Sequence, residues 1–581
     1  MRKRFIAFFA MLCMLLTVLP VTTGAAGLTL TKTNIGNSGA TIAVSGGSGT
    51  VTAVSGNTEV ATCSVSGTTV TVNGVAGKKG IVPITVTRGS LESVIEVAIG
   101  YTAFQFNGRS VTVYPGADLN YEVLAIEMAS ETEFTGAEGT GELTVTQNAD
   151  GSTAYTAAQG YELNVGIKKK GGIYSFSGTT ENGNISVKKE SSKDATILLD
   201  GLTLTSAFTA AITVKKDSTA KVYIDTLAGS VNTLRDSAKN NADSYGPTAD
   251  GGDSSNQYYA ESAVIKGKTA SDITFAGTGT LNVIASAKNG IKGGANGHIT
   301  VADGSITITA PNAGISTENE MLISGGTLNI TSTGDALKAA DDTDTIGTIY
   351  VTGGSVTANS QDEGILVRNA LYVTGGTLNI TAAGDGIKAE NASSTSGDIE
   401  ISGGSFTITS TGDGITGFNV ELDGGTYNIT CANGYTNTSF NSSTSSAKGL
   451  KAELDLTIAG GSYTISAPDD AVHSDGNLTI QGGTFDIWTR DDGFHANRYM
   501  TFGMRGASDD LIHATVNFSY EGMEGADIIL NSGYLTIKSQ DDTINAANKN
   551  LSNYHYTIKV YGGVYRLYTP ANTSSRNLIY Y

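Results

Sequence analysis

A repeating pattern of apolar and polar residues covers most of the chain, from about residue 162 onward. In each repeat, apolar residues stand four and two positions before a Gly-Gly or Ser-Gly turn, and apolar residues alternate with Thr or Ser after it, as in Thr377-Leu-Asn-Ile-Thr381. The closest turns are 22 residues apart, as between Gly461 and Gly483. Alternation of period two points one face of each strand inward, and a single coil cannot bury that face alone. The pattern therefore predicts stacked coils of three short strands, which is an all-β parallel β-helix, or solenoid, over residues 162–581.

The residues before the solenoid divide into three predicted parts. Residues 1–26 carry three basic residues, a long apolar run and small residues, which is the pattern of a signal peptide. Residues 27–100 contain short alternating segments separated by Gly and Asn, which predicts a small β-sandwich. Residues 101–161 are partly acidic and Gly-rich, and we expect a connector with a small β segment there.

The most regular polar position of the solenoid is a carboxylate nine residues after the second glycine of a turn. The residues at this position are Asp335, Glu363, Asp385, Asp413, Asp470, Asp492 and Asp542, with Glu521 at the equivalent place in one further coil. A second acid directly precedes four of them, namely Asp362, Asp469, Asp491 and Asp541. Equivalent residues of successive coils stack roughly 4.8 Å apart, so these side chains should form one column.

Two carboxylates at that spacing repel by roughly 3–4 kcal/mol at an effective dielectric near 20. A hard cation that bridges adjacent coils would remove this repulsion, and Ca²⁺ best accepts irregular shells of oxygen ligands. The alternative is that Asp-Gly merely suits a tight turn, although Glu363 and Glu521 are then unexplained. Lys448 occupies the same position between Asp413 and Asp470, and we expect it to divide the column into two metal-binding runs.

Charge and cysteine content narrow the possible partners. The formal net charge is −19, which makes nucleic acid and anionic membranes poor partners. The three cysteines, one of them in the leader, indicate neither a disulfide framework nor a zinc site. No second long apolar run follows the leader, so we expect a secreted or cell-surface monomer without membrane insertion.

A few further side chains could contact a ligand near the column. His473 and His495 each follow a column acid by three residues and should stack, with Asn545 further along. They could donate to sugar oxygens, complete a metal shell, or simply be exposed polar residues. Trp488 alternates with inward-pointing residues, so it should point outward as a platform for a sugar ring, unless a loop covers it.

Two sets of motifs resemble known families. Residues 55–86 resemble bacterial immunoglobulin-like domains, which are usually spacers or adhesion units. The segments Lys448-Gly-Leu-Lys-Ala452, Asp469-Asp-Ala-Val-His-Ser474, Asp491-Asp-Gly-Phe-His-Ala496, Ser519-Tyr-Glu-Gly-Met-Glu-Gly525 and Asp541-Asp-Thr-Ile-Asn-Ala546 resemble, in order, the signature coils of a bacterial extracellular carbohydrate-binding β-helix family. This resemblance implies a right-handed β-helix with bound calcium, similar to family 9 polysaccharide lyases. It also implies binding to cellulose and to acidic polysaccharides such as pectin.

Three functions remain open from the sequence. The first is a calcium-dependent polysaccharide-binding protein, in which Ca²⁺ bridges protein carboxylates to those of an acidic glycan. The second is a polysaccharide lyase, which needs calcium and a lysine base, and Lys338 or Lys388 would supply the base because each follows a column acid by three residues. The third is a structural adhesin stalk.

Overall fold

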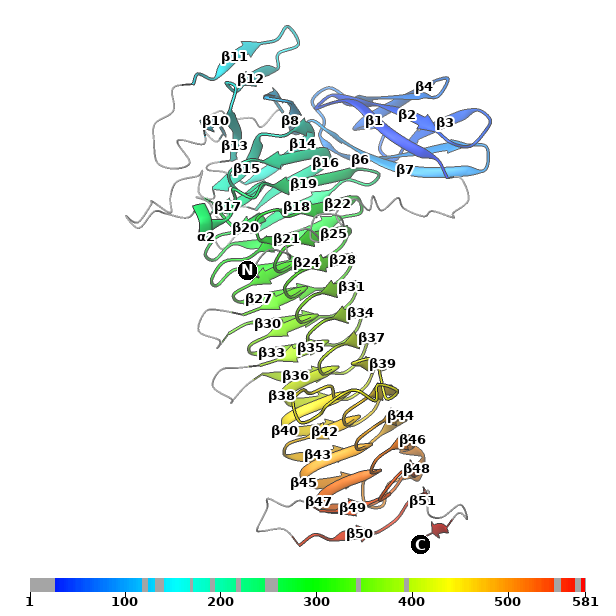
Figure 1. Ribbon diagram of the computed structural model, residues 1–581. Coiled ribbons are helices and arrows are strands. Elements are labelled where there is room, and N and C mark those ends of the chain that lie inside the picture. The colour runs from blue at the N-terminus through cyan, green and yellow to red at the C-terminus, as the bar shows by residue number, and fades with distance from the viewer. Residues whose placement is uncertain are drawn as a thin grey trace, which may run out of the picture.

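The computed structural model describes residues 27–116, 124–130, 141–167, 171–188, 194–215, 221–245, 260–340, 346–390, 397–547, 555–569 and 576–579. The predicted signal peptide, residues 1–26, lies outside the described residues. Within them the chain is all-β, as predicted, apart from the short helices α2 (Ala242–Tyr245) and η1 (Asp509–Leu511). A small unit of antiparallel strands sits beside the first coils of a long solenoid (Figure 1).

The N-terminal unit is a β-sandwich. One sheet has the order β1 (Thr29–Gly36), β2 (Gly39–Ser45), β5 (Thr69–Gly74) and β4 (Ala61–Ser66), and the other has the order β3 (Val51–Ser55), β6 (Gly80–Arg88) and β7 (Leu91–Ile99). All of these strand pairs are antiparallel. Alternating residues such as Ile42, Val70, Ile84 and Ile95 are fully buried between the two sheets. The assignment to the immunoglobulin-like family remains a prediction.

Polar and apolar contacts hold the sandwich against the solenoid. Lys32 of β1 forms an ion pair with Asp200, and both side chains are almost completely buried. Glu96 of β7 accepts a hydrogen bond from the N–H of Ala228 through Oε2 at 2.8 Å, and its own N–H donates to the Ala228 carbonyl at 3.0 Å. Ala98 packs nearby in a small buried cluster. These contacts fix the position of the sandwich at the first coils.

The predicted connector contains β8 (Thr102–Asn107), β9 (Ser110–Tyr114), β10 (Leu124–Ser130), β11 (Thr144–Gln147) and β12 (Thr153–Thr156). Strand β8 pairs in parallel with β14 (Gly172–Thr180), and Phe104 stacks on Phe176 at 4.8 Å between ring centroids. The long sheet and its core therefore reach into this segment. The limits of the connector at residues 101 and 161 remain a prediction.

The solenoid strands pair in parallel with their equivalents in the next coil, which produces three ladders along the molecule. The first ladder contains β18 (Val222–Thr226), β21 (Asp272–Gly277), β24 (His298–Val301), β27 (Glu320–Ile323), β30 (Thr348–Val351), β33 (Ala370–Val373), β36 (Asp398–Ile401), β43 (Asn477–Ile480) and β50 (Ile558–Val560). The second contains β19 (Val231–Asp236), β22 (Thr280–Ile284), β25 (Ser305–Ala310), β28 (Thr327–Ser332), β31 (Ser355–Ser360), β34 (Thr377–Ala382), β37 (Ser405–Ser410), β39 (Thr426–Cys431), β41 (Ser462–Ala467), β44 (Gly483–Thr489), β46 (Ile512–Ser519), β48 (Tyr534–Ser539) and β51 (Val564–Tyr568). This arrangement is that of a parallel β-helix, and its right-handed sense remains a prediction.

The third ladder begins with β13 (Tyr161–Ile167) and bears the acidic column at its edge. It continues through β15 (Gly183–Lys188), β17 (Ile212–Lys215), β20 (Ala263–Gly267), β23 (Asn289–Lys292), β26 (Ile315–Thr317), β29 (Leu337–Ala339), β32 (Ile365–Val367), β35 (Ile387–Ala389), β42 (Val472–Ser474) and β49 (Asn545–Ala546). Longer strands serve two ladders, namely β16 (Ala195–Ser206), β38 (Ile415–Leu422), β40 (Leu450–Ile458), β45 (Phe494–Phe502) and β47 (Met523–Leu530). Strand β52 (Arg576–Ile579) pairs antiparallel with β51.

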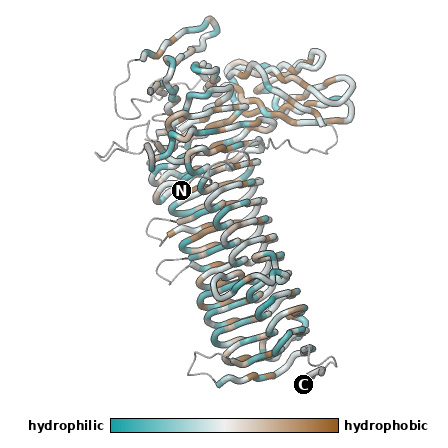
Figure 2. The backbone as a smooth tube through the Cα atoms, in the orientation of Figure 1, coloured by the Kyte–Doolittle hydropathy of each residue, from teal (hydrophilic) through white to brown (hydrophobic). Residues whose placement is uncertain are grey.

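The core of the solenoid consists of the inward residues of all three ladders. Apolar and polar residues alternate around each coil, as Figure 2 shows. Aromatic rings fill one part of this core: Phe406, Tyr427, Tyr463 and Phe485 stack with centroids 4.8, 4.6 and 4.8 Å apart. The hydroxyl of Tyr463 donates to the Gly460 carbonyl at 2.7 Å, so a buried polar group is satisfied inside the stack.

Candidate functional site

Backbone hydrogen bonds join the column residues of successive coils into one ladder. The N–H that follows each column residue donates to the carbonyl oxygen of the column residue in the next coil, at 2.8–3.1 Å. The order along this ladder is Asp335, Glu363, Asp385, Asp413, Lys448, Asp470, Asp492, Glu521 and Asp542. The structure therefore confirms that the carboxylates stack coil upon coil and that Lys448 interrupts them.

Lys448 is bound to the acids on both sides. Its Nζ lies 2.6 Å from Asp469 Oδ1 and 3.4 Å from Asp470 Oδ2, and its backbone N–H donates to Asp413 Oδ1 at 2.8 Å. Burial alone would lower the pKa of Lys448, but the charges of Asp470 and Asp469 outweigh this effect and raise it above its usual value. The amine therefore remains a fixed positive charge between the two acidic runs.

The column acids that follow Lys448 form the lower run, and those that precede it form the upper run. The lower run contains an all-carboxylate group formed by Asp469, Asp470 and Asp491. One oxygen of each lies within 4.8 Å of the others, and Asp469 and Asp470 are only 2% and 3% exposed. Burial, and then the charges of Asp470 and Asp469, raise the pKa of Asp491 to about 6. Converging carboxylate oxygens at this depth are the donor set that a hard divalent cation such as Ca²⁺ prefers. The residues present therefore fit calcium.

His473 and His495 lie in register on neighbouring coils beside this group, with ring centroids 4.7 Å apart and the rings tilted by 54°. Nδ1 of His473 lies 2.7 Å from Asp470 and its Nε2 lies 3.0 Å from Asp475, and the side chain is buried rather than exposed. Nδ1 of His495 lies 2.9 Å from Asp492. Burial alone would lower the pKa of His495, but Asp492 and Asp470 raise it to about 9. The His495 imidazole therefore carries a positive charge between Asp470 and Asp492 of adjacent coils, whereas His473 contacts two acids of its own coil.

The upper run contains a second all-carboxylate group, formed by Asp335, Asp362 and Glu363. Asp335 is buried, and its Oδ1 has no hydrogen-bond partner among the described residues. Its Oδ2 lies 3.0 Å from the Nζ of Lys338. A hydrogen bond with Glu363, together with burial, raises the pKa of Asp362. An unpaired buried oxygen next to two further carboxylates also fits a cation.

Five predicted ligands lie outside every group of converging metal-ligating side chains among the described residues, namely Asp385, Asp413, Glu521, Asp541 and Asp542. Asp413 is buried and accepts hydrogen bonds from Ser446 Oγ at 2.6 Å and from the N–H of Lys448. Asp385 accepts a hydrogen bond from the N–H of Asp413 at 2.7 Å. Asp541 and Asp542 are exposed. The structure therefore places two groups made only of carboxylates in the column, one on each side of Lys448.

The outward residues of the third ladder form a second row beside the column, and sequence reasoning missed part of it. In strand register the lower part of this row reads Lys451, His473, His495, Glu524 and Asn545. Glu524 forms a group of possible ligands with Asp492 and His495. Its signal was present in the sequence, because it follows Glu521 by three residues as His495 follows Asp492. Asn545 donates both to Glu521 Oε1 at 3.1 Å and to Oε2 at 2.9 Å.

Trp488 is half-buried on the outward side of the second ladder, in register with Ser466 and Phe518 of the neighbouring coils. The inserted segment 432–447 reaches both neighbours. The N–H of Tyr435 donates to Ser466 Oγ at 3.2 Å, and its ring lies 5.7 Å from that of Phe518. Trp488 therefore lies between two positions that this segment contacts.

Fold and site together define a β-solenoid protein with a long face of carboxylates, imidazoles and lysines, which suits an extended polymer better than a small molecule. Residues 161–366 and 347–493 match the family of carbohydrate-binding domain-containing proteins. These matches cover more than half of the chain, so the protein belongs to this family. Its partner is therefore a carbohydrate.

The other comparisons add little to this assignment. A polysaccharide lyase-like protein from C. thermocellum, solved as a gadolinium derivative, is 20% identical, with a TM-score of 0.29, over 65% of this chain and 96% of that one. No curated protein matches the sequence. Among the described residues no helix has the length and apolar character needed to cross a membrane.

Proposed function

We propose that this protein is a secreted, calcium-dependent carbohydrate-binding protein for plant cell-wall polysaccharide. Acidic chains such as polygalacturonate are the preferred ligand, and cellulose is a second one. Support comes from one observation above all, the convergence of Asp469, Asp470 and Asp491 on one edge of the solenoid. Asp469, Asp470 and Asp491 would hold the ion, and its positive charge would attract uronate carboxylates, which would let a protein with a net charge of −19 hold an acidic glycan.

The rest of the molecule is assigned supporting roles in this proposal. The solenoid is right-handed. The column residues outside the two all-carboxylate groups either bind the calcium ions as further ligands or position the residues that do. Four further side chains either contact the sugar directly or position the carboxylates that bind calcium, namely His473, His495, Trp488 and Asn545. The N-terminal sandwich is an immunoglobulin-like spacer or adhesion module beside the first coils. The protein acts as a monomer.

The contacts of the two lysines favour binding over the lyase alternative. A lyase base must be an amine that can lose its proton near neutral pH. The Nζ of Lys388 lies 3.0 Å from Glu390 and 3.5 Å from both Glu363 and Asp385. Burial alone would lower the pKa of Lys388, but these carboxylates raise it above its usual value. Lys388 is therefore poorly suited to remove a proton, and the Nζ of Lys338 is paired with Asp335 at 3.0 Å.

Affinity electrophoresis through gels that contain polygalacturonate tests the proposal. The protein should be retarded when calcium is present and should run freely with excess chelator, while a parallel solution assay gives no ultraviolet absorbance from unsaturated product. Growing absorbance would instead show a lyase. The absence of both retardation and product on polygalacturonate and cellulose would contradict the proposal and leave the structural stalk.

The calcium affinity should weaken as the pH falls. The pKa of Asp491 is raised to about 6, so below that value the carboxyl holds a proton that calcium must displace. If one proton is displaced, the dissociation constant for Ca²⁺ rises by up to about tenfold per pH unit below the pKa and is nearly constant well above it. Calorimetric titrations between about pH 5 and about pH 8 would measure this dependence. The variant Asp491→Asn should bind more weakly with a flatter profile, and a wild-type affinity that is constant over this range would refute the expectation.

A further inference from the structure

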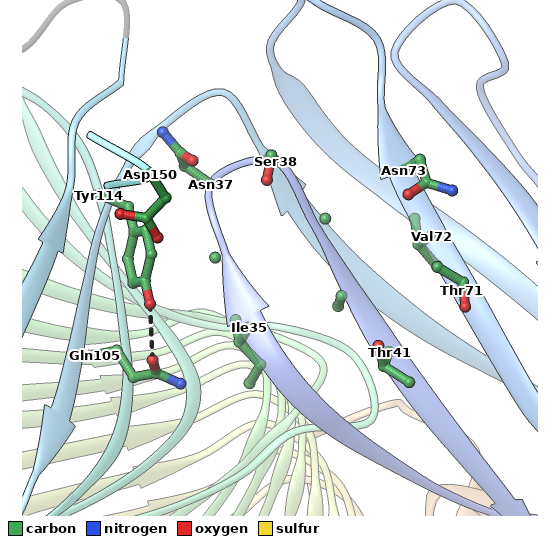
Figure 3. Close-up of a pocket in the computed structure, with 13 residues that line it drawn as sticks. Ile35, Asn37, Ser38, Thr41, Thr71, Val72, Asn73, Gln105, Tyr114 and Asp150 are labelled. Carbon is green, nitrogen blue, oxygen red and sulfur yellow. Dashed lines mark hydrogen bonds between the residues drawn. The ribbon is translucent and has the colours of Figure 1, made fainter. Parts of the chain in front are cut away.

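A cavity of about 380 Å³ lies where the sandwich meets the first strands of the long sheet. One wall is the outer side of β1, β2 and β5, and the other is formed by β8, β9 and the turn between β11 and β12 (Figure 3). Tyr114 and Asp150 stand together on one side of the close-up, with Thr71 and Asn73 on the opposite side. Ligand cavities of roughly 300–1,000 Å³ occur preferentially at such boundaries between domains.

The lining is polar and almost uncharged. The sandwich contributes the hydroxyls of Thr41 and Thr71 and the amide of Asn73, while the opposite wall contributes Gln105, Tyr114 and Asp150. Among the described residues of the lining, Asp150 is the one charged side chain, and none is a lysine, arginine or histidine. Such a mixture of donors and acceptors without cationic groups suits a neutral ligand that carries many hydroxyl groups, and it does not suit an anion.

Several of these groups are already oriented by the protein. The Tyr114 hydroxyl donates to Gln105 Oε1 at 3.3 Å, which turns the amide nitrogen of Gln105 away from that bond. Oδ1 of Asp150 accepts from the N–H of Ser152 at 3.0 Å and from its Oγ at 2.6 Å. Burial raises the pKa of Tyr114, and the charge of Asp150 raises it further, so the phenol stays protonated.

Glycine keeps one edge of the tyrosine ring uncovered. A Cβ placed on Gly36 would lie 3.9 Å from ring atoms of Tyr114, so the absence of a side chain there leaves the ring accessible from the β1–β2 turn. An aromatic ring surrounded by hydroxyl, amide and carboxylate groups presents the combination that sugars require, because a sugar has both C–H faces and hydroxyl edges.

From these contacts we infer that the cavity is a second carbohydrate site, which binds one or two neutral sugar rings without calcium. The inference rests on the proposed carbohydrate binding but not on the acidic column, which lies along the solenoid and uses other residues. A protein with both sites would hold a neutral polysaccharide at the sandwich and an acidic one along the solenoid. This would bring two polymers of the same wall together.

The test uses the full-length mature protein in excess chelator, so that any calcium-dependent site is silent. Cellotetraose, xylotetraose and mannotetraose are titrated by calorimetry and by saturation-transfer NMR. At least one of them should bind. The variant Thr71→Trp fills the cavity from the outer side of β5 and should weaken that binding by at least about tenfold. Thr31→Trp is the matched control, because Thr31 is exposed on β1 of the same sheet and lies outside the lining.

The results decide the cavity and the acidic column independently of each other. Absence of binding by all three tetrasaccharides, or full wild-type affinity in Thr71→Trp, would overturn the inference. Equal losses in Thr71→Trp and Thr31→Trp would also overturn it, because they would indicate general damage to the sandwich. Calcium-dependent retention on polygalacturonate should be unchanged in Thr71→Trp. If that retention is absent even in the wild type, the proposed function fails while the neutral-sugar result still decides the cavity.

Discussion

Replacing Asp470 by asparagine should abolish calcium-dependent retention on polygalacturonate and weaken calcium binding by about a hundredfold. Asp470 is 3% exposed and belongs to the group with Asp469 and Asp491. Burial alone would raise the pKa of Asp470, but His473, Lys448 and His495 outweigh this effect and keep the carboxyl ionised. The amide has nearly the same shape but lacks the charge that a calcium ion needs. Calorimetric titration with Ca²⁺ and affinity electrophoresis would measure both effects.

The matched control is Asp423→Asn. Asp423 is exposed and lies outside the groups of converging ligands, so this change removes the same charge without touching the column. It should leave calcium affinity and retention unchanged. Wild-type retention in Asp470→Asn, in a variant whose circular dichroism is normal, would contradict the account, as would an equal loss in Asp423→Asn.

The second large effect is expected on stability, from Tyr463→Ala. The ring of Tyr463 is fully buried between Tyr427 and Phe485, with centroids 4.6 and 4.8 Å away. Removal of a buried aromatic ring from a close-packed stack costs about 3–5 kcal/mol, because the neighbouring coils cannot close the space fully. Urea unfolding followed by circular dichroism should show a transition at clearly lower denaturant concentration.

Tyr463→Phe separates the ring from its hydroxyl. This variant keeps the stack and loses only the 2.7 Å hydrogen bond to Gly460, so the destabilisation should be about 1 kcal/mol. A Tyr463→Ala protein as stable as the Tyr463→Phe protein would show that the stack contributes little to the solenoid.

The sequence predicted the column because the solenoid is periodic. A fixed offset of nine residues from the turn places each acid at the same point of its coil, and strand pairing then stacks them without any long-range information. The same argument placed Lys448 in the column, where it is found bonded to Asp469. Features that repeat with the coil could therefore be read from the sequence.

Features that depend on side-chain conformation or on distant segments could not be predicted in this way. Thr-Ser-Thr-Gly precedes both Asp413 and Asp335, yet Oδ1 of Asp413 accepts a hydrogen bond from Ser446 of the inserted segment, while Oδ1 of Asp335 has no partner among the described residues. The buried imidazole of His473 is bonded to Asp475 as well as to Asp470. The contact of Lys32 with Asp200 joins residues 168 positions apart and has no periodic signal.

The most direct test of the central claim is anomalous diffraction from crystals of the mature protein grown with calcium and trigalacturonate. The account predicts an anomalous peak among the carboxylates of Asp469, Asp470 and Asp491, with a uronate carboxyl of the sugar on the same ion. A sugar bound along the solenoid without an ion at these carboxylates would contradict it, and so would an ion at this group with the sugar bound elsewhere.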